Sequence, residues 1–129
     1  MSDNLTVGAI TLFVSDIAVA TEFYLRVFDT EAIFQDEAST ALRFTNIVIN
    51  LLVDSEAPEL VEPANVAPAG SGTRSQLTIT VDSCDATVAE LTGRGAALLN
   101  GPIDRPWGQR TAAFADPDGH VWEVASDVI

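Results

Sequence analysis

The sequence predicts an α+β fold made of two successive βαβββ modules, with helices on the outer face of mixed, mostly antiparallel sheets. Three observations lead to this prediction. An alternating apolar segment followed by apolar residues at helical spacing occurs near residues 10–28 and again near residues 77–93. Shorter strand patterns follow each repeat, and a proline-rich stretch separates the two. With helices on one face only, we expect the other face of each sheet to form a concave cleft.

The first module is expected at about residues 5–54. Ile10, Leu12 and Val14 alternate with Thr11 and Phe13, as in a strand with one face against a core. The next polar residue, Asp16, offers an N-cap, and apolar residues then recur at helical spacing to about residue 28. Three further strands are expected near residues 32–35, 41–45 and 47–53.

The second module, at about residues 75–129, repeats this order. Leu77, Ile79 and Val81 alternate in a strand, and Ser83 or Asp85 can cap the helix that follows. A short strand near residues 97–99, a loop at 101–108, and a hairpin of residues 111–115 and 120–125 are expected next. The hairpin turn is Asp116-Pro117-Asp118-Gly119, where proline and glycine suit the backbone angles of a turn.

Residues 55–74 form the predicted linker between the modules, since they combine three prolines and several acids with Ala69-Gly70-Ser71-Gly72. The chain of 129 residues, 47% of them hydrophobic, has the length of one compact domain and can bury a sizeable core. We therefore expect a single domain, 1–129, composed of the two modules.

The charge balance excludes several classes of partner. Six arginines, no lysines and nineteen acids give a net charge of -13, which repels nucleic acid and anionic membrane surfaces. No signal peptide or membrane span is evident, so a cytoplasmic location is expected. The single cysteine, Cys84, has no partner for a disulfide and no metal-ligand spacing, and we interpret it as a small helix residue.

The second module contains two motifs, Pro-Trp-Gly-Gln-Arg at 106–110 and Phe-Ala-Asp-Pro-Asp-Gly-His-Val-Trp-Glu at 114–123. These motifs resemble those of the glyoxalase, bleomycin-resistance and extradiol-dioxygenase superfamily, also called the vicinal oxygen chelate superfamily. The first module is similar through Val-Ser-Asp-Ile at 14–17 and Glu-Phe-Tyr at 22–24. The resemblance covers nearly the whole chain except the linker. It implies the two-module fold and a homodimer that covers the sheet edges, but no particular function.

Catalytic members of that superfamily hold a divalent metal with His, Gln, Glu or Tyr on the first and last strands of each module. The corresponding positions here are Ala9, Asn50, Gln76 and Glu123. One carboxylate with neutral amides is too weak a donor set for such an ion. We therefore expect no metal and no other cofactor, and we interpret the only histidine, His120, as a solvent-exposed turn residue.

Residues that alternate with the core positions should line the cleft and bind a small-molecule ligand. Trp107 can stack on a planar ligand and Arg110 can supply a cation, although Trp107 could instead pack the loop. Glu123 could accept a ligand donor, act as a general base, or simply pair with Arg110 or Gln76. The expected ligand-binding residues are Thr11, Phe13, Asn50, Gln76, Thr78, Trp107, Arg110 and Glu123.

The resemblance and the missing metal donors favour a non-catalytic binding protein. Such a protein would sequester an antibiotic or another planar or cationic metabolite, as bleomycin-type resistance proteins do. Two alternatives stay open. One is a metal-dependent lyase or dioxygenase of the same superfamily, and the other is a metal-free isomerase or hydrolase with Glu123 as its catalytic base.

Overall fold

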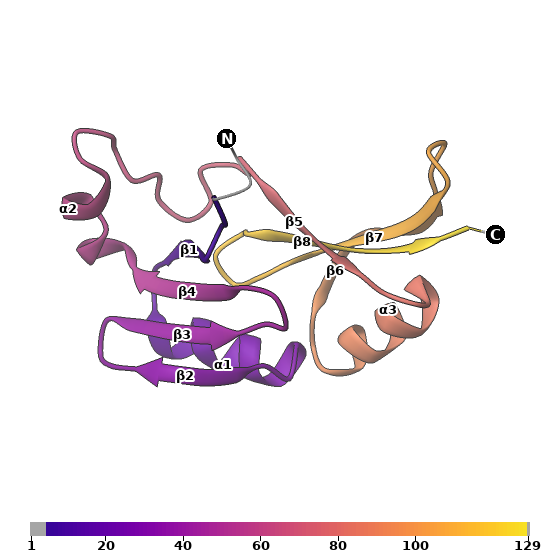
Figure 1. Ribbon diagram of the computed structural model, residues 1–129, viewed down its shortest axis with the longest axis horizontal. Coiled ribbons are helices and arrows are strands. Elements are labelled where there is room, and N and C mark those ends of the chain that lie inside the picture. Colours follow the sequence, from indigo (N-terminus) through magenta and orange to yellow (C-terminus); the bar gives the residue numbers. More distant parts are fainter. Residues whose placement is uncertain (1–4, 129) are drawn as a thin grey trace. The chain divides into compact units, whose positions relative to one another are not determined.

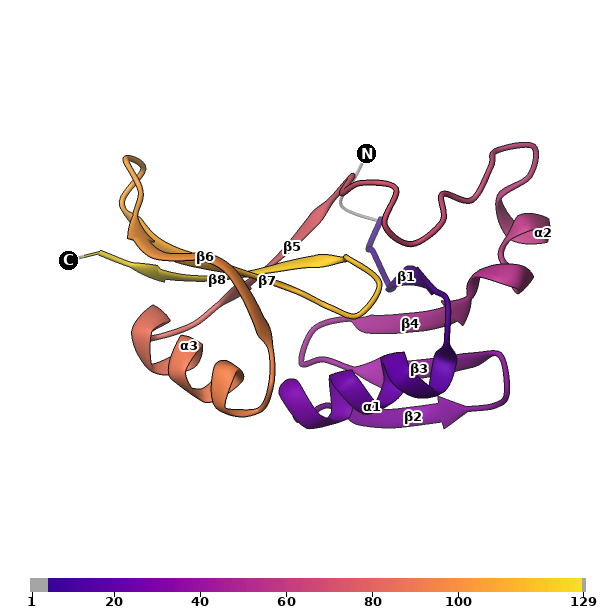
Figure 2. The ribbon, with the colours of Figure 1, turned by 180° about the vertical axis from the view of Figure 1, so that it is seen from behind.

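The computed structural model describes residues 5–128, and the chain forms two compact units, Met1–Ala69 and Gly70–Ile129. Each unit contains one strand, one helix and three further strands in sequence order, and two short helices follow them in the first unit (Figures 1 and 2). The predicted α+β fold of two βαβββ modules is thereby confirmed. The boundary between the units falls inside the expected linker, so most of that linker belongs to the first unit.

The sheet of the first unit has the strand order β1-β4-β3-β2, in which only the β1/β4 pair is parallel. Short helices in the expected linker were not predicted, and Pro58 occupies the first position of one of them, where its fixed φ favours a helix. The elements of this unit are β1 (Ala9–Val14), α1 (Ile17–Val27), β2 (Glu31–Gln35), β3 (Ser39–Arg43), β4 (Val48–Val53), the short 3-10 helix Asp54–Glu56 and α2 (Pro58–Val61).

Helix α1 begins at the expected cap. The Asp16 carboxylate accepts the backbone N–H groups of Ala18 at 3.0 Å and Val19 at 3.1 Å. The helix packs against β4 and β3 through a buried apolar face. Tyr24 is the largest fully buried side chain, and its ring is stacked on Phe28.

The sheet of the second unit has the equivalent order β5-β8-β7-β6, again with one parallel pair, β5/β8. Strand β6 is longer than predicted and takes in part of the expected loop at 101–108, because two register shifts accommodate residues that break strand periodicity. The elements of this unit are β5 (Gln76–Thr80), α3 (Cys84–Gly93), β6 (Ala97–Asp104), β7 (Gln109–Ala115) and β8 (Val121–Asp127).

The turn between β7 and β8 is held by Asp116. Its buried carboxylate accepts the backbone N–H groups of Asp118 at 2.9 Å and His120 at 2.8 Å. His120 is half-buried, not solvent-exposed as expected, since its backbone closes this turn. On β8, Trp122 points to the helix-bearing face and is 3% exposed, which places Glu123 on the opposite face.

None of the helices formed by residues 5–128 has the length and apolar character needed to cross a membrane.

Candidate functional site

Glu123 lies at the centre of the helix-free face of the second sheet. Its register partners are Thr78 on β5 and Ala113 on β7. The Thr78 hydroxyl donates to Glu123 Oε1 at 2.8 Å, and no ion pair to this carboxylate is found within residues 5–128. A half-buried carboxylate with one hydroxyl partner retains unused acceptor lone pairs, so it can accept a donor from a ligand.

A guanidinium group lies over the same face. Arg105 Nε donates to the Thr111 hydroxyl at 2.9 Å, and its Nη2 donates to Asn100 Oδ1 at 3.2 Å. Thr111 alternates with Ala113 on β7, and Asn100 is paired with Ala113, so both share the face of Glu123. Strand spacing and rise place the Thr111 and Glu123 positions about 8 Å apart. We call the surface formed by Thr78, Asn100, Arg105, Thr111, Ala113 and Glu123 the Glu123 face.

Trp107 lies at the end of the Glu123 face, in the turn that joins β6 to β7. The backbone N–H of Gly108 donates to the Arg105 carbonyl at 3.1 Å and closes this turn. The Trp107 indole is 65% exposed, and its Nε1 donates to Gln109 Oε1 at 3.2 Å. Gln109 alternates with Thr111 and Ala113, so its side chain belongs to the same face, about 13 Å along β7 from the level of Glu123.

Arg110, expected in the cleft, lies on the opposite face. Its Nε donates to Asp85 Oδ1 and its Nη1 to Asp104 Oδ1, each at 2.9 Å. Hydrogen bonds to Asp85 and Asp104 raise the pKa of the Arg110 guanidinium. Strand alternation is the physical reason, because Arg110 and Ala113 are three residues apart on β7 and therefore project to opposite sides. Arg105, which the sequence did not single out, provides the cation on the Glu123 face.

The first unit has a small pocket on the helix-free face of its sheet. Thr11, Asn50 and Ala41 lie side by side on β1, β4 and β3 and form its floor. Asn50 Nδ2 is 3.5 Å from the Thr11 hydroxyl, a long and weak contact. Phe34 and Leu60, both largely exposed, form its walls around a volume of about 240 Å³. The sequence placed Thr11 and Asn50 together, whereas Leu60 was hidden in the expected linker.

Two other residues that were expected to bind the ligand take no part in the contacts described above. Phe13 is half-buried on β1 and paired with Leu52, outside the lining of that pocket. Gln76 is exposed at the start of β5 and paired with Val121, two positions before Thr78. The expected Glu123–Gln76 or Glu123–Arg110 pairing does not form, because the parallel register sets Thr78 directly beside Glu123.

The expected metal-ligand positions do not fit a divalent ion. In the first unit, Ala9 has no donor atom and Asn50 has only a neutral amide. In the second, the carboxylate of Glu123 adjoins the hydroxyl of Thr78, and Gln76, two positions before Thr78 on β5, offers only a neutral amide. Within residues 5–128, no three His, Cys, Asp or Glu side chains gather closely enough to hold a metal. Divalent ions in proteins need more charged or imidazole donors than this set offers.

Cys84 is remote from the Glu123 face. It is the first residue of α3, is buried, and lies against the helix-bearing side of β8, where its thiol is 4.0 Å from the Val124 carbonyl. Burial, followed by the charge of Asp85, raises the pKa of the Cys84 thiol. These features support the interpretation of Cys84 as a structural residue.

Comparison with known proteins gives consistent matches. The model of the Glyoxalase/Bleomycin resistance protein/Dioxygenase superfamily matches residues 6–124. An uncharacterized protein of Mycobacterium bovis is 27% identical over 124 residues, which cover 91% of this chain and 80% of that protein. A glyoxalase-related enzyme from Fulvimarina pelagi is 25% identical, with a TM-score of 0.81 over 95% of this chain and 88% of that one. A Nocardioides glyoxalase/bleomycin resistance protein/dioxygenase is 21% identical, with a TM-score of 0.85 over 95% and 83%.

Proposed function

Because the chain belongs to the glyoxalase/bleomycin resistance protein/dioxygenase superfamily, we propose that it binds a small molecule on the Glu123 face without transforming it. The observation that carries this proposal is the placement of opposite charges on one face. Glu123 and Arg105 are held by hydrogen bonds to threonine hydroxyls and not by an ion pair with each other. Each charge can therefore interact with a ligand.

The chemistry of the face defines the ligand. Glu123 would accept an amine or hydroxyl, and Arg105 would donate to a carbonyl or carboxylate oxygen. The small side chain of Ala113, which is 4% exposed, lies between them in the sheet. The exposed indole of Trp107 would stack on a ligand that extends roughly 13 Å from Glu123. A planar natural product with polar groups at intervals, such as an antibiotic, fits these requirements.

A non-catalytic role is favoured over the superfamily's metal-dependent reactions because the residues at the expected ligand positions are poor metal donors. Ala9 offers no donor atom, and Asn50 and Gln76 offer only neutral amides. A carboxylate held by the Thr78 hydroxyl is sufficient to bind a ligand donor and does not require a metal.

The test begins with a thermal-shift screen of planar and cationic natural products on the full chain. Binding of a validated hit is then measured by isothermal titration. Glu123→Gln and Arg105→Gln should each weaken binding by about tenfold, since a hydrogen bond to a charged group contributes roughly 1.5–3 kcal/mol. Trp107→Ala should weaken it by a similar factor through lost stacking.

Arg110→Gln is the matched control, because it removes a nearby guanidinium that lies on the opposite face of the sheet, on β7. It should leave the dissociation constant unchanged. The proposal fails if Arg110→Gln weakens binding as much as Arg105→Gln does. Mass spectrometry after long incubation should detect only the intact ligand. More than one equivalent of a converted product per protein molecule would show that the protein is an enzyme.

A further inference from the structure

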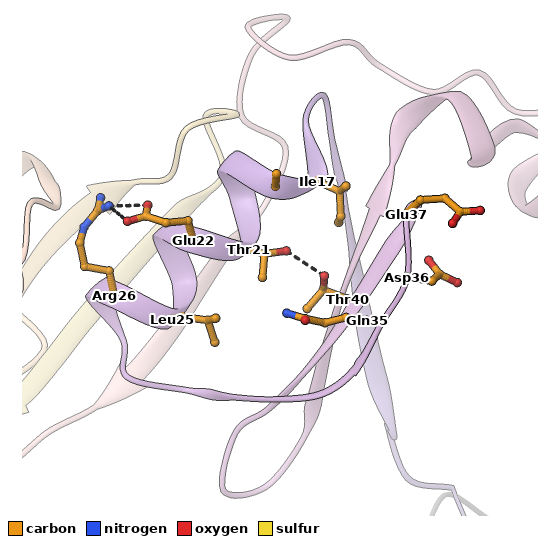
Figure 3. Close-up of a pocket in the computed structure, with 10 residues that line it drawn as sticks. Ile17, Thr21, Glu22, Leu25, Arg26, Gln35, Asp36, Glu37 and Thr40 are labelled. Carbon is orange, nitrogen blue, oxygen red and sulfur yellow. Dashed lines mark hydrogen bonds and ion pairs between the residues drawn. The ribbon is translucent and has the colours of Figure 1, made fainter.

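A second recess lies on the helix-bearing face of the first unit, opposite the face that carries Thr11 and Asn50. Helix α1 packs over β4 and β3, while β2 is the outermost strand of the sheet. An open groove of about 730 Å³ lies between α1 and the β2–β3 hairpin, and Figure 3 shows the residues that line it. We call it the α1 groove. Its uncharged lining consists of Ile17, Ala18, Thr21, Leu25, Gln35 and Thr40.

The floor of the α1 groove combines apolar surface with a buried hydroxyl pair. Ile17 and Leu25 are half-buried and Ala18 is exposed along one side of the helix. Thr21 and Thr40, 9% and 2% exposed, have their hydroxyl oxygens 2.8 Å apart. One hydroxyl hydrogen is used within this pair, and within residues 5–128 neither side chain has a second hydrogen bond. Lone pairs and one hydroxyl hydrogen are therefore available to a polar group in the groove.

The rim of the α1 groove is acidic. Arg26 is its only basic residue and forms an ion pair with Glu22 on the same helix (Figure 3). Asp36 and Glu37, across the groove, form no ion pair among the residues that the structure describes. The backbone N–H groups of Ala38 and Ser39 lower the pKa of Asp36, which keeps this carboxylate ionised.

We propose that the α1 groove binds a small organic cation with an apolar body. The ammonium group lies beside Asp36 and Glu37, and the apolar body lies along Ile17, Ala18 and Leu25. The volume is within the range of roughly 300–1,000 Å³ found for small-molecule sites. The net charge of -13 attracts cations to this rim. The acidic rim opposes a second copy of this chain as the occupant of this groove, because the copy is also acidic.

The experiment uses two probes of equal chain length and opposite charge, decyltrimethylammonium and decyl sulfate, below their micelle concentrations and at low ionic strength. NMR titration of the full chain should show saturable binding of decyltrimethylammonium. The largest amide shifts should lie within residues 17–26 and 35–40. Decyl sulfate should bind at least about tenfold more weakly. Equal affinity for both probes, no saturable binding of the cation, or shifts confined to other residues would overturn the proposal.

Two variants locate the site. Glu37→Gln removes an exposed rim carboxylate and should weaken decyltrimethylammonium binding by about threefold, as expected for a solvent-exposed charge pair. Glu59→Gln is the matched control, since it makes the same change in charge on exposed α2, outside the groove. The proposal is wrong if both variants lose the same affinity.

A variant that blocks the groove distinguishes a small cation from a second copy of this chain as the occupant. Ala18→Trp introduces a large ring into the groove from an exposed helix position and should abolish probe binding while the circular dichroism spectrum stays unchanged. If this variant unfolds, the Glu37→Gln and Glu59→Gln pair still decides the question. A dimer by light scattering that Ala18→Trp dissociates would identify a second copy as the occupant and refute the small-cation proposal.

Discussion

Gly101 in β6 allows a sharp test of how closely the second sheet is packed. Its φ of +90° lies in the left-handed region, and a Cβ added there would be 2.4 Å from the Thr111 carbonyl oxygen and 2.8 Å from Ala112 Cα. Both atoms belong to the backbone of β7, which cannot yield as a flexible side chain can. Gly101→Ala must therefore strain its own backbone and also push two paired strands apart.

The expected loss in free energy of unfolding is the sum of these two costs. A non-glycine residue at positive φ costs about 1–2 kcal/mol, and an overpacked contact adds roughly 1–3 kcal/mol. Gly101→Ala should therefore lower the free energy of unfolding by about 2–5 kcal/mol. Gly108→Ala is the control, because Gly108 has a φ of +92° but no atom within 4 Å of an added Cβ. It should incur only the first cost, about 1–2 kcal/mol.

Urea unfolding followed by circular dichroism measures both variants against the parent protein. The difference between the two variants isolates the contact between β6 and β7. Equal destabilisation by Gly101→Ala and Gly108→Ala would refute the close approach of these strands. Gly101→Ala should also weaken ligand binding at the Glu123 face, since the preceding residue, Asn100, holds the Arg105 guanidinium.

Three other predictions concern single side chains. Asp16→Ala removes the N-cap of α1 and should cost about 1 kcal/mol in urea unfolding, whereas Asp82→Ala, which removes an exposed carboxylate outside any helix, should cost little. Backbone N–H groups lower the pKa of Asp36, so an NMR titration should give this carboxyl a pKa below its ordinary 3.8. The stability that the ionised carboxylate contributes is present above pH 3.8 and is lost as the pH falls through the lowered pKa. Burial raises the pKa of the Cys84 thiol, so a disulfide reagent at pH 8 should react slowly with the native protein and rapidly in urea; equal rates would contradict the buried position.

Elements with regular periodicity could be predicted from the sequence. Alternating apolar residues and a polar cap located β1, α1, β5 and α3, because strand and helix periods are local properties of the chain. Strand β6 was predicted too short since Gly101, Pro102 and two register shifts interrupt its alternation. Helix α2 was predicted as linker, because Pro58 is equally typical of a turn and of a helix start.

The candidate site could be predicted only in part. Thr78 and Glu123 were expected on one face, but the register that makes them partners depends on how β5 and β8 align, which alternation does not specify. Arg110 was expected on this face, but its position on β7 directs it to the opposite face, and Arg105 was not considered. The side chain of Arg105 reaches the Glu123 face from beyond the end of β6, and its direction depends on the irregular backbone before it.

The turn at Asp116 also bears on the order in which the second unit folds. One carboxylate satisfies two backbone N–H groups within five residues, so the β7–β8 hairpin closes a short loop at little entropic cost. Thr78 and Glu123 are 45 positions apart, and their strands pair only after α3, β6 and the hairpin have been spanned. Contacts between distant residues form slowly, so we expect the hairpin to form early and β5 to join late. The hydrogen bond between Thr78 and Glu123 would then form only at the final stage of folding. Local unfolding of β5 alone would remove this part of the ligand site while most of the sheet stays folded.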